Sequence, residues 1–212
     1  MRAILISLTL MGLLLGVVQE VKGDVNVGVS VGEEGLKGFY FSVGEYFRVP
    51  EREVIVIRER RIPDEEIPVV LFLAARARVA PGVIIDLRFR GKTWMDITIH
   101  YGLSPEIYYV PVKVEVKGPP YGKAYGHYKN KQKKDWKKIV LSNDEVINLV
   151  NLRFISEYHH HPPEEVIRTR SEGKTFVAIH TDVKKGKGKE KDFEGSSKGN
   201  GDKGKGKGKG KG

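Results

Sequence analysis

Residues 72–97 read FLAARARVAPGVIIDLRFRGKTWMDI, and residues 154–179 read FISEYHHHPPEEVIRTRSEGKTFVAI. The two stretches align at an offset of 82 and share the triplet Gly-Lys-Thr. In such a pattern proline opens a helix, paired aliphatic residues face the core, glycine ends the helix and threonine caps the next one. We therefore predict a duplicated unit of three helices. The matched pairs are Phe72/Phe154, Leu73/Ile155, Pro81/Pro163, Ile84/Val166, Ile85/Ile167, Arg88/Arg170, Trp94/Phe176 and Ile97/Ile179.

Capping and turn residues predict further helices around these stretches. Segment 50–61 opens with proline and acidic residues and closes with arginines, which is helix polarity, although its β-branched run 54–57 favours a strand. Residues 54–58, VIVIR, are a short third echo of the repeat. Two more helices are predicted, one capped by Asp64 and running to Ala80, the other opened by a capping box of Ser142 and Glu145 and running to about Tyr158.

The segment before these helices alternates apolar and polar residues with a period of two. Residues 24–31 read DVNVGVSV, and residues 38–49 continue the alternation with Phe39, Phe41 and Val43. A turn-rich stretch, GEEGLKG, separates them, so the pattern predicts a β-hairpin over residues 24–49. The hairpin would either lie on the helical core or pair through its edge with a protein partner.

The predicted fold is therefore mainly α-helical, with a small N-terminal β-hairpin and a C-terminal tail that is too polar to fold. The segments that we expect, in chain order, are a signal peptide over 1–23, the β-hairpin over 24–49, a first helical half over 50–110, a Tyr/Lys-rich linker over 111–141, a second helical half over 142–183 and a disordered Lys/Gly tail over 184–212.

The first 23 residues have the layout of a cleaved export signal. Arg2 precedes an apolar stretch over 3–18, and Val21 and Gly23 are small enough for the signal peptidase, which predicts cleavage before Asp24. A membrane anchor is the alternative, but the apolar stretch is shorter than the roughly 20 residues that cross a bilayer. The mature chain is expected to be secreted or periplasmic, with no transmembrane span.

Composition excludes some chemistry and locates the charge. The chain has no cysteine, which excludes disulfides, thiolate metal sites, iron–sulfur clusters and cysteine nucleophiles. The formal net charge of +10 is concentrated in two segments. Residues 184–212 contain eleven lysines and four acidic residues, and residues 121–138 contain seven lysines and one aspartate. A negatively charged partner should therefore bind at these two segments.

Residues 118–138, GPPYGKAYGHYKNKQKKDWKK, interleave aromatic rings with lysines and glycines. Rings can stack on bases or sugars while ammonium groups neutralise phosphate, uronate or sulfate. Because lysine is a point charge, such binding would be unspecific and sensitive to salt. The alternative is a solvated linker whose rings fold back on the core. The candidate polyanion-binding residues are Tyr121, Lys123, Tyr125, Tyr128, Lys129, Lys131, Lys133, Lys134, Trp136, Lys137 and Lys138.

Residues 83–110 read VIIDLRFRGKTWMDITIHYGLSPEIYYV, with core and turn positions at Ile84, Ile85, Leu87, Gly91, Ile97, Gly102, Leu103 and Ser104. This spacing resembles the helix-turn-helix of bacterial transposase and recombinase domains. The resemblance implies a helix-turn-helix-like fold and DNA binding by the helix after Ser104. That helix would present Pro105, Glu106, Tyr108 and Tyr109, and it lacks the basic or amide side chains that read base edges.

Other motifs are incomplete. The two Gly-Lys-Thr triplets lack the earlier glycine of a phosphate-binding loop, because Asp86 and Arg168 occupy its place. We predict no cofactor and no metal site. The nearest approach to a metal site is the run His159, His160 and His161, of which at most two side chains could bind one ion.

No motif predicts an enzymatic activity. The acidic pairs Glu65/Glu66 and Glu164/Glu165 fall in first helical turns, where the helix dipole favours them, so they do not indicate a hydrolase. We expect an exported, non-catalytic bacterial envelope or extracellular protein that binds anionic polymers or surfaces, such as polysaccharide, lipid headgroups or extracellular nucleic acid, through its lysine-rich segments. Two alternatives stay open: a nucleic-acid-binding protein with a degenerate helix-turn-helix, and an enzyme whose site is built from non-contiguous residues.

Overall fold

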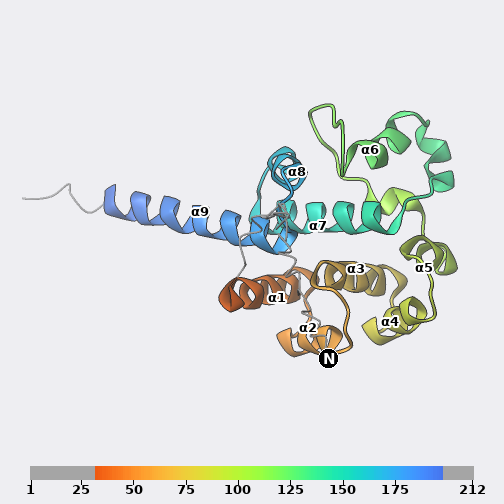
Figure 1. Cartoon of the computed structure of the whole chain (residues 1–212), viewed down its shortest axis with the longest axis horizontal. Helices are drawn as coiled ribbons and strands as arrows, with labels where there is room; N and C mark the ends of the chain where they lie inside the picture. Colours follow the sequence, from red (N-terminus) through yellow and green to blue (C-terminus); the bar gives the residue numbers. More distant parts are fainter. Residues whose placement is uncertain (1–31, 198–212) are drawn as a thin grey trace, which may run out of the picture.

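The computed structural model describes residues 32–197 of the 212-residue chain, with side chains described over 32–186. Within these residues the chain is mainly helical and contains no β-strand (Figure 1). The helices in chain order are α1 (Glu33–Phe47), α2 (Glu51–Glu59), η1 (Asp64–Glu66), α3 (Ile67–Ala77), α4 (Pro81–Phe89), α5 (Trp94–His100), η2 (Pro105–Tyr108), α6 (Gly122–Lys129), η3 (Lys133–Lys138), α7 (Asn143–His159), α8 (Pro163–Ser171) and α9 (Phe176–Ser197), where η marks a 3-10 helix.

The helices stack in layers around α3 and α7. In the view of Figure 1, α3 lies below α7, α2 and α4 lie below α3, and α8 lies above α7. The first turns of α9 close the core against α1 and α7, where the ring of Phe39 is 5.7 Å from that of Phe154 and 5.6 Å from that of His180. The rest of α9 extends away from this body (Figure 1).

The most apolar helix of the body is α3. Every residue from Ile67 to Ala74 is buried, so this helix is covered on all sides by its neighbours. Among residues 32–197 no single helix is both long and apolar enough to cross a membrane. The segments Asp64–Ala77 and Pro81–Phe89 reach that length and composition only together, across a bend of 118°.

The hairpins α3–α4 and α7–α8 have the same local structure at an offset of 82. The first helix of each ends in a residue with positive φ, Arg78 at 56° and His160 at 49°. The second helix of each is followed by a glycine with positive φ, Gly91 at 79° and Gly173 at 92°, a conformation that glycine adopts without strain. Stretches that align in the sequence therefore fold alike.

The hairpin α1–α2 repeats this geometry 30 positions before α3–α4, with Arg48 (φ 57°) and Arg61 (φ 62°) at the positive-φ positions. In each hairpin an N–H just after the first helix donates to a carbonyl five residues earlier, which satisfies the helix end. These bonds are Val49 to Gly44 (2.9 Å), Val79 to Ala74 (3.0 Å) and His161 to Ser156 (2.9 Å). The sequence shows this third copy only over 54–58, because the copies share backbone turns more than side chains.

Residues 38–49 do not form the predicted β-strand; most of them lie in α1. Phe39, Tyr40 and Val43 are buried there, whereas Phe41 is 47% exposed. Buried positions that recur after three or four residues mark a helix, and the alternation that favoured a strand is a coincidence of that pattern. The other predicted strand, 24–31, lies outside the described residues, as does the predicted signal peptide.

The helix predictions around the repeat are confirmed with changed ends. Segment 50–61 contains α2, and Ser142 and Glu145 form the predicted capping box at the start of α7. Asp64 begins η1 instead of capping a long helix, because its carboxylate accepts a hydrogen bond from the Tyr40 hydroxyl. Helix α9 runs on through residues 184–197 of the segment for which a tail is predicted, and residues 198–212 lie outside the described part of the chain.

Candidate functional site

The lysine-rich segment folds as two short helices, α6 and η3, at one end of the body (Figure 1). Its core-facing residues recur after three or four positions, as on an amphipathic helix. These residues are Tyr121, Ala124, Tyr125 and Tyr128, none of which is more than 8% exposed. The segment is therefore part of the folded body, and its rings fold back on the core, as the alternative to a ligand-binding platform expected.

The three tyrosines of this segment are buried and hydrogen-bonded. Each hydroxyl group donates to a backbone carbonyl. Tyr125 donates to Val110 (2.8 Å), Tyr128 donates to Pro105 (2.8 Å) and Tyr121 donates to Asn148 (3.4 Å). Burial raises the pKa of each phenol above its usual value. The expectation that these rings stack on a ligand is thereby corrected, because in the folded chain they face the core.

Trp136 is half-buried and joins η3 to the same core. Its indole Nε1 donates to the carbonyls of Tyr128 and Lys131, both at 3.2 Å. Its ring centroid lies 4.7 Å from that of Tyr109 and 5.0 Å from that of Tyr128. These contacts fix η3 against the loop that follows α6, so the backbone that carries its lysines is anchored to the body.

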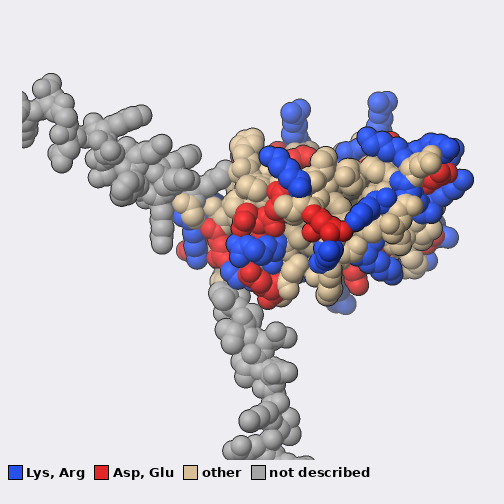
Figure 2. Space-filling model, turned by 90° about the horizontal axis from the view of Figure 1, so that it is seen from above, with Lys and Arg blue, Asp and Glu red and all other residues tan. Residues whose placement is uncertain are grey.

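All seven lysines of the segment are exposed, and we call them the lysine face: Lys123, Lys129, Lys131, Lys133, Lys134, Lys137 and Lys138. Figure 2 shows blue side chains gathered at this end of the molecule. Lys129 pairs with Glu115 at 2.5 Å, and Lys138 pairs with Asp135 at 3.1 Å. Hydrogen bonds from Lys129 and Lys117 lower the pKa of Glu115 to about 2, so that its carboxylate stays charged.

Most of the lysine face is not neutralised by neighbouring acids. Lys133 lies 5.9 Å from the centroid of the Trp136 ring. Among residues 32–186 the structure shows no ion pair for Lys123, Lys131, Lys134 or Lys137. The face therefore presents a surplus of positive charge to solvent, which is what a polyanion would neutralise.

A buried carboxylate lies beneath this face and was missed in the sequence. Glu145 is 5% exposed, and its Oε2 accepts the N–H of Ser142 at 2.7 Å in the capping box. Its Oε1 lies 3.6 Å from Nε2 of His127 on α6, and neither of these two atoms has a hydrogen-bond partner. The capping pattern indicated Glu145 as a helix cap, but only the fold shows that it also faces α6.

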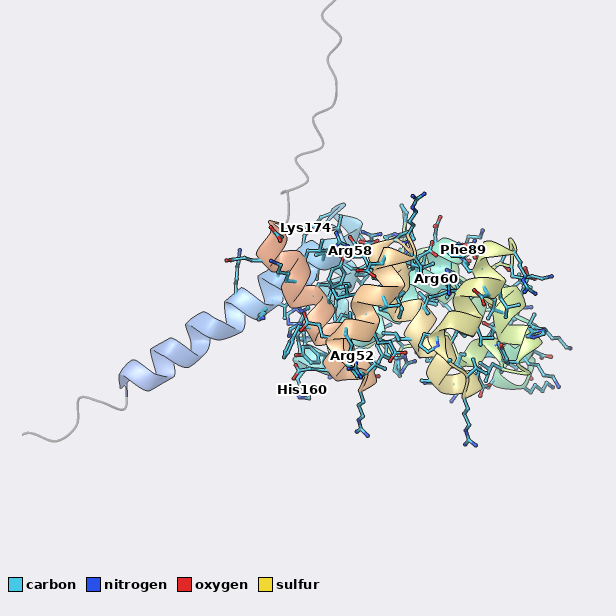
Figure 3. The ribbon with its side chains drawn as sticks, turned by 90° about the horizontal axis from the view of Figure 1, so that it is seen from below. Arg52, Arg58, Arg60, Phe89, His160 and Lys174 are labelled. Carbon is cyan, nitrogen blue, oxygen red and sulfur yellow. The ribbon has the colours of Figure 1, made fainter. Side chains whose placement is uncertain are left out.

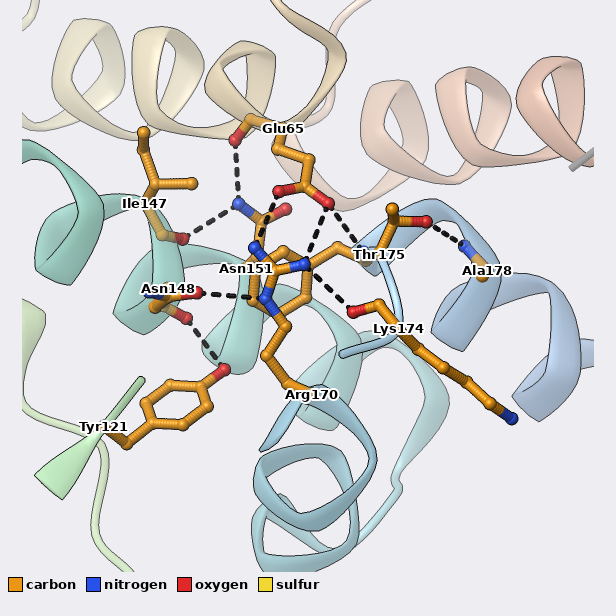
Figure 4. Close-up of polar contacts among 10 residues, drawn as sticks. Glu65, Tyr121, Ile147, Asn148, Asn151, Arg170, Lys174, Thr175 and Ala178 are labelled. Atoms are coloured by element: carbon orange, nitrogen blue, oxygen red, sulfur yellow. Dashed lines mark hydrogen bonds and ion pairs between the residues drawn. The ribbon is translucent and has the colours of Figure 1, made fainter. Parts of the chain in front are cut away.

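A second cluster joins η1 to the second half of the chain (Figure 4). Arg170 donates to both carboxylate oxygens of Glu65, at 3.1 and 3.4 Å, and to the carbonyl of Lys174 at 2.9 Å. Asn151 donates to the backbone carbonyl of Glu65 at 2.8 Å. A hollow of about 800 Å³ opens beside this cluster, lined in part by Asp64, Glu65, Glu66, Asp144 and Arg170.

The first half of the chain holds an equivalent cluster. Arg88 donates to the two oxygens of Glu66 at 3.2 and 3.4 Å and to the carbonyl of Lys92 at 3.1 Å. Its guanidinium lies 4.7 Å from the ring centroid of Trp94, as that of Arg170 lies 4.4 Å from Phe176. Neighbouring glutamates of η1 thus hold the two matched arginines, so these carboxylates have a structural partner.

The histidine run divides between core and surface. His159 is 5% exposed and its ring lies 4.9 Å from that of His180, whereas His160 is exposed. Burial, with smaller contributions from His159 and Lys184, lowers the pKa of His180 to about 3. Over the described residues no group of three or more His, Cys, Asp or Glu side chains is placed to hold a metal ion.

The helix implied by the helix-turn-helix resemblance is absent from the described residues after Ser104. In its place η2 makes a single turn whose Pro105 and Tyr108 are buried, and the Tyr108 hydroxyl lies 2.6 Å from that of Thr98. A turn packed into the core cannot enter a DNA groove, so this implied role is wrong for η2.

Comparisons of the chain with protein-family models, curated proteins and solved structures found no match.

Proposed function

We propose that the protein is an exported, non-catalytic protein that binds anionic polymers or anionic surfaces through its lysine face. The observation that carries this proposal is the exposure of all seven lysines on a segment whose tyrosines are packed in the core. Several ammonium groups gathered on one folded segment can neutralise several charges of one polymer at once and release its counterions. Export rests on the pattern of residues 1–23.

Binding of this kind depends on charge and not on ring stacking, because the tyrosines are buried. It should therefore weaken steeply with salt and discriminate little between polymers. The eleven lysines of 184–212 provide a second contact of the same kind. A duplex-DNA binder with a degenerate helix-turn-helix over residues 83–110 would keep its affinity after deletion of 184–212, whereas our proposal expects a large loss.

We also propose that the helical body is an internally duplicated scaffold for this face. The hairpin α3–α4 follows the hairpin α1–α2 at a spacing of 30 residues, but the hairpin α7–α8 follows α3–α4 at a spacing of 82. The additional residues between the second and third copies include α6 and η3. Insertions between repeats are common sites of binding, because the repeats supply a rigid support.

The test is charge reversal at two matched places. A triple variant, Lys133→Glu, Lys134→Glu and Lys137→Glu, reverses part of the lysine face. The control variant, Arg52→Glu, Arg90→Glu and Lys92→Glu, makes the same change in net charge at exposed positions on or near α2 and α4. Arg52 lies on α2 (Figure 3), which is on the other side of the body from α6 in Figure 1, and among the described residues none of these three controls has an ion pair.

Binding to dextran sulfate, polygalacturonate and polyphosphate is measured by fluorescence anisotropy over a range of salt concentrations. We expect the lysine-face variant to lose on the order of tenfold or more in affinity and to lower the slope against log salt by about three. The control should change affinity by less than about threefold. Equal losses in both variants would show that net charge alone, and not this face, attracts the polymer.

A further inference from the structure

The lysine face contains a hollow of about 370 Å³ over α6. It is lined by Lys123, Gly126, His127, Asn130 and Lys131. The first four of these residues are spaced by three, one and three positions, which places them on the side of the helix opposite the buried tyrosines. Because glycine has no side chain, Gly126 leaves a gap between Lys123 and Asn130. A Cβ atom added at Gly126 would meet no other atom within 4 Å.

The groups around this gap are hydrogen-bond donors that the fold leaves available. Lys123 and Lys131 are exposed and have no ion pair, and the exposed Asn130 has no side-chain hydrogen bond, in the described part of the chain. His127 is half-buried. Its Nε2 lies 3.6 Å from Oε1 of the buried Glu145 carboxylate.

We propose that this hollow binds a phosphate group of the anionic polymer, an inference that rests on the proposed function and deepens it. Separate donors that approach from several directions suit the tetrahedral oxygens of phosphate, to which lysine binds as a point charge. Planar carboxylates are recognised best by the guanidinium fork of arginine, and residues 91–152 contain no arginine. The hollow is therefore expected to add a preference for phosphate-bearing chains over polyuronates to the unspecific attraction of the rest of the lysine face.

Substitution at Gly126 tests the hollow without removing a lysine. Gly126→Gln fills the gap with an uncharged side chain, and Gly126→Ala is the matched control, since both remove the helix-weakening glycine but only the longer side chain reaches the lysines. The probes are inorganic polyphosphate and polygalacturonate, measured by isothermal titration calorimetry. We expect Gly126→Gln to weaken polyphosphate binding on the order of tenfold, and Gly126→Ala to change it by less than about twofold. Polygalacturonate binding should be the same in both variants and in the wild type.

A second variant covers the case in which Gly126→Gln does not fold, as judged by circular dichroism. Lys123→Gln removes one donor of the hollow from an exposed position, and Lys134→Gln removes a lysine of the same face outside it. We expect the first to weaken polyphosphate binding at least about threefold more than the second.

The outcomes separate this inference from the proposed function. If Gly126→Gln binds polyphosphate as the wild type does, while the triple lysine variant has lost binding, the hollow is not the site but the lysine face still is. If Gly126→Gln weakens both polymers equally, the hollow takes any anion and the assignment to phosphate is wrong. If neither Gly126→Gln nor the triple lysine variant changes polyphosphate binding, the inference about the hollow and the proposed function both fail.

Discussion

Arg170 holds the Glu65 carboxylate with two guanidinium nitrogens, at 3.1 and 3.4 Å, across 105 positions of the chain. Oε1 of the same carboxylate accepts the N–H of Phe176 at 2.7 Å, so one side chain fixes both the end of α8 and the start of α9. Both partners of the ion pair are mostly buried, with side chains 24% and 21% exposed. Removal of one partner of such a pair costs more than removal of one partner of an exposed pair, because it leaves the other partner desolvated and unpaired.

Substitution of Glu65 should therefore destabilise the fold. We expect Glu65→Gln to lower the free energy of unfolding by about 2 kcal/mol, because the amide still accepts from Phe176 but no longer neutralises Arg170. The control is Asp86→Asn, which removes the exposed pair with Arg60 (2.7 Å) and should cost less than about 1 kcal/mol. Figure 3 shows Arg60 beside Phe89 on the same surface. Urea denaturation measures both variants, and equal losses would contradict the special role of Glu65.

The sequence predicts the arginines of this cluster but not their partners. Arg88 and Arg170 stand out because both copies of the repeat carry them. Glu65 and Glu66 look like ordinary acids of a first helical turn, and nothing local indicates that η1 lies between the two copies. Partners far apart in the chain are set by tertiary packing, on which a local pattern carries no information.

The tyrosines of α6 illustrate the same limit. Rings interleaved with lysines are compatible with a ligand platform and with the core side of an amphipathic helix. The spacing of Tyr121, Tyr125 and Tyr128 repeats after three or four positions, which fits the second interpretation. Turn and capping residues, in contrast, act within a few positions, so Gly91 and Ser142 could be assigned from the sequence alone.

The capping box of α7 gives a second prediction. The Ser142 hydroxyl accepts the Glu145 N–H at 3.2 Å, whereas the comparable bond from Glu106 to the Ser104 hydroxyl is 3.5 Å long and caps only one turn. We expect Ser142→Ala to lower the free energy of unfolding by about 1 kcal/mol and Ser104→Ala by a few tenths at most. Thermal denaturation followed by circular dichroism compares the two. A larger loss for Ser104→Ala would show that the α7 cap contributes little to the fold.

Two helical glycines should respond in opposite ways to alanine. At Gly44 an added Cβ would lie 3.0 Å from the carbonyl oxygen of Val49, which is backbone and cannot easily move. We expect Gly44→Ala to destabilise the protein by about 1–3 kcal/mol. Gly126→Ala, which meets open space, should stabilise it by about 0.5–1 kcal/mol, because alanine favours the helix. Chemical denaturation measures both, and a Gly44→Ala variant as stable as the wild type would mean that the α1–α2 hairpin can open enough to admit a Cβ atom.

The buried His180 should make the fold sensitive to acid. Its imidazole is 1% exposed and neither ring nitrogen has a hydrogen-bond partner, so the protonated form is disfavoured and the pKa falls from its ordinary 6.5 to about 3. Below pH 6.5 the unfolded chain binds this proton and the folded chain does not, so acidification favours unfolding until the folded pKa is reached. We expect this one group to cost on the order of 2 kcal/mol between pH 7 and pH 4.5.

His180→Phe separates this effect from the other groups that titrate in the same range. Phenylalanine fills a similar space beside Phe39 and Phe154 and binds no proton, so the variant should lose less stability than the wild type between pH 7 and pH 4.5. The control His100→Phe changes an exposed histidine and should follow the wild type. The measurement is urea denaturation at both pH values. The comparison concerns the change in the free energy of unfolding between the two pH values, so a uniform loss of stability from imperfect packing in His180→Phe does not affect it. An equal change in all three proteins would show that His180 is protonated as easily in the folded chain as in the unfolded one.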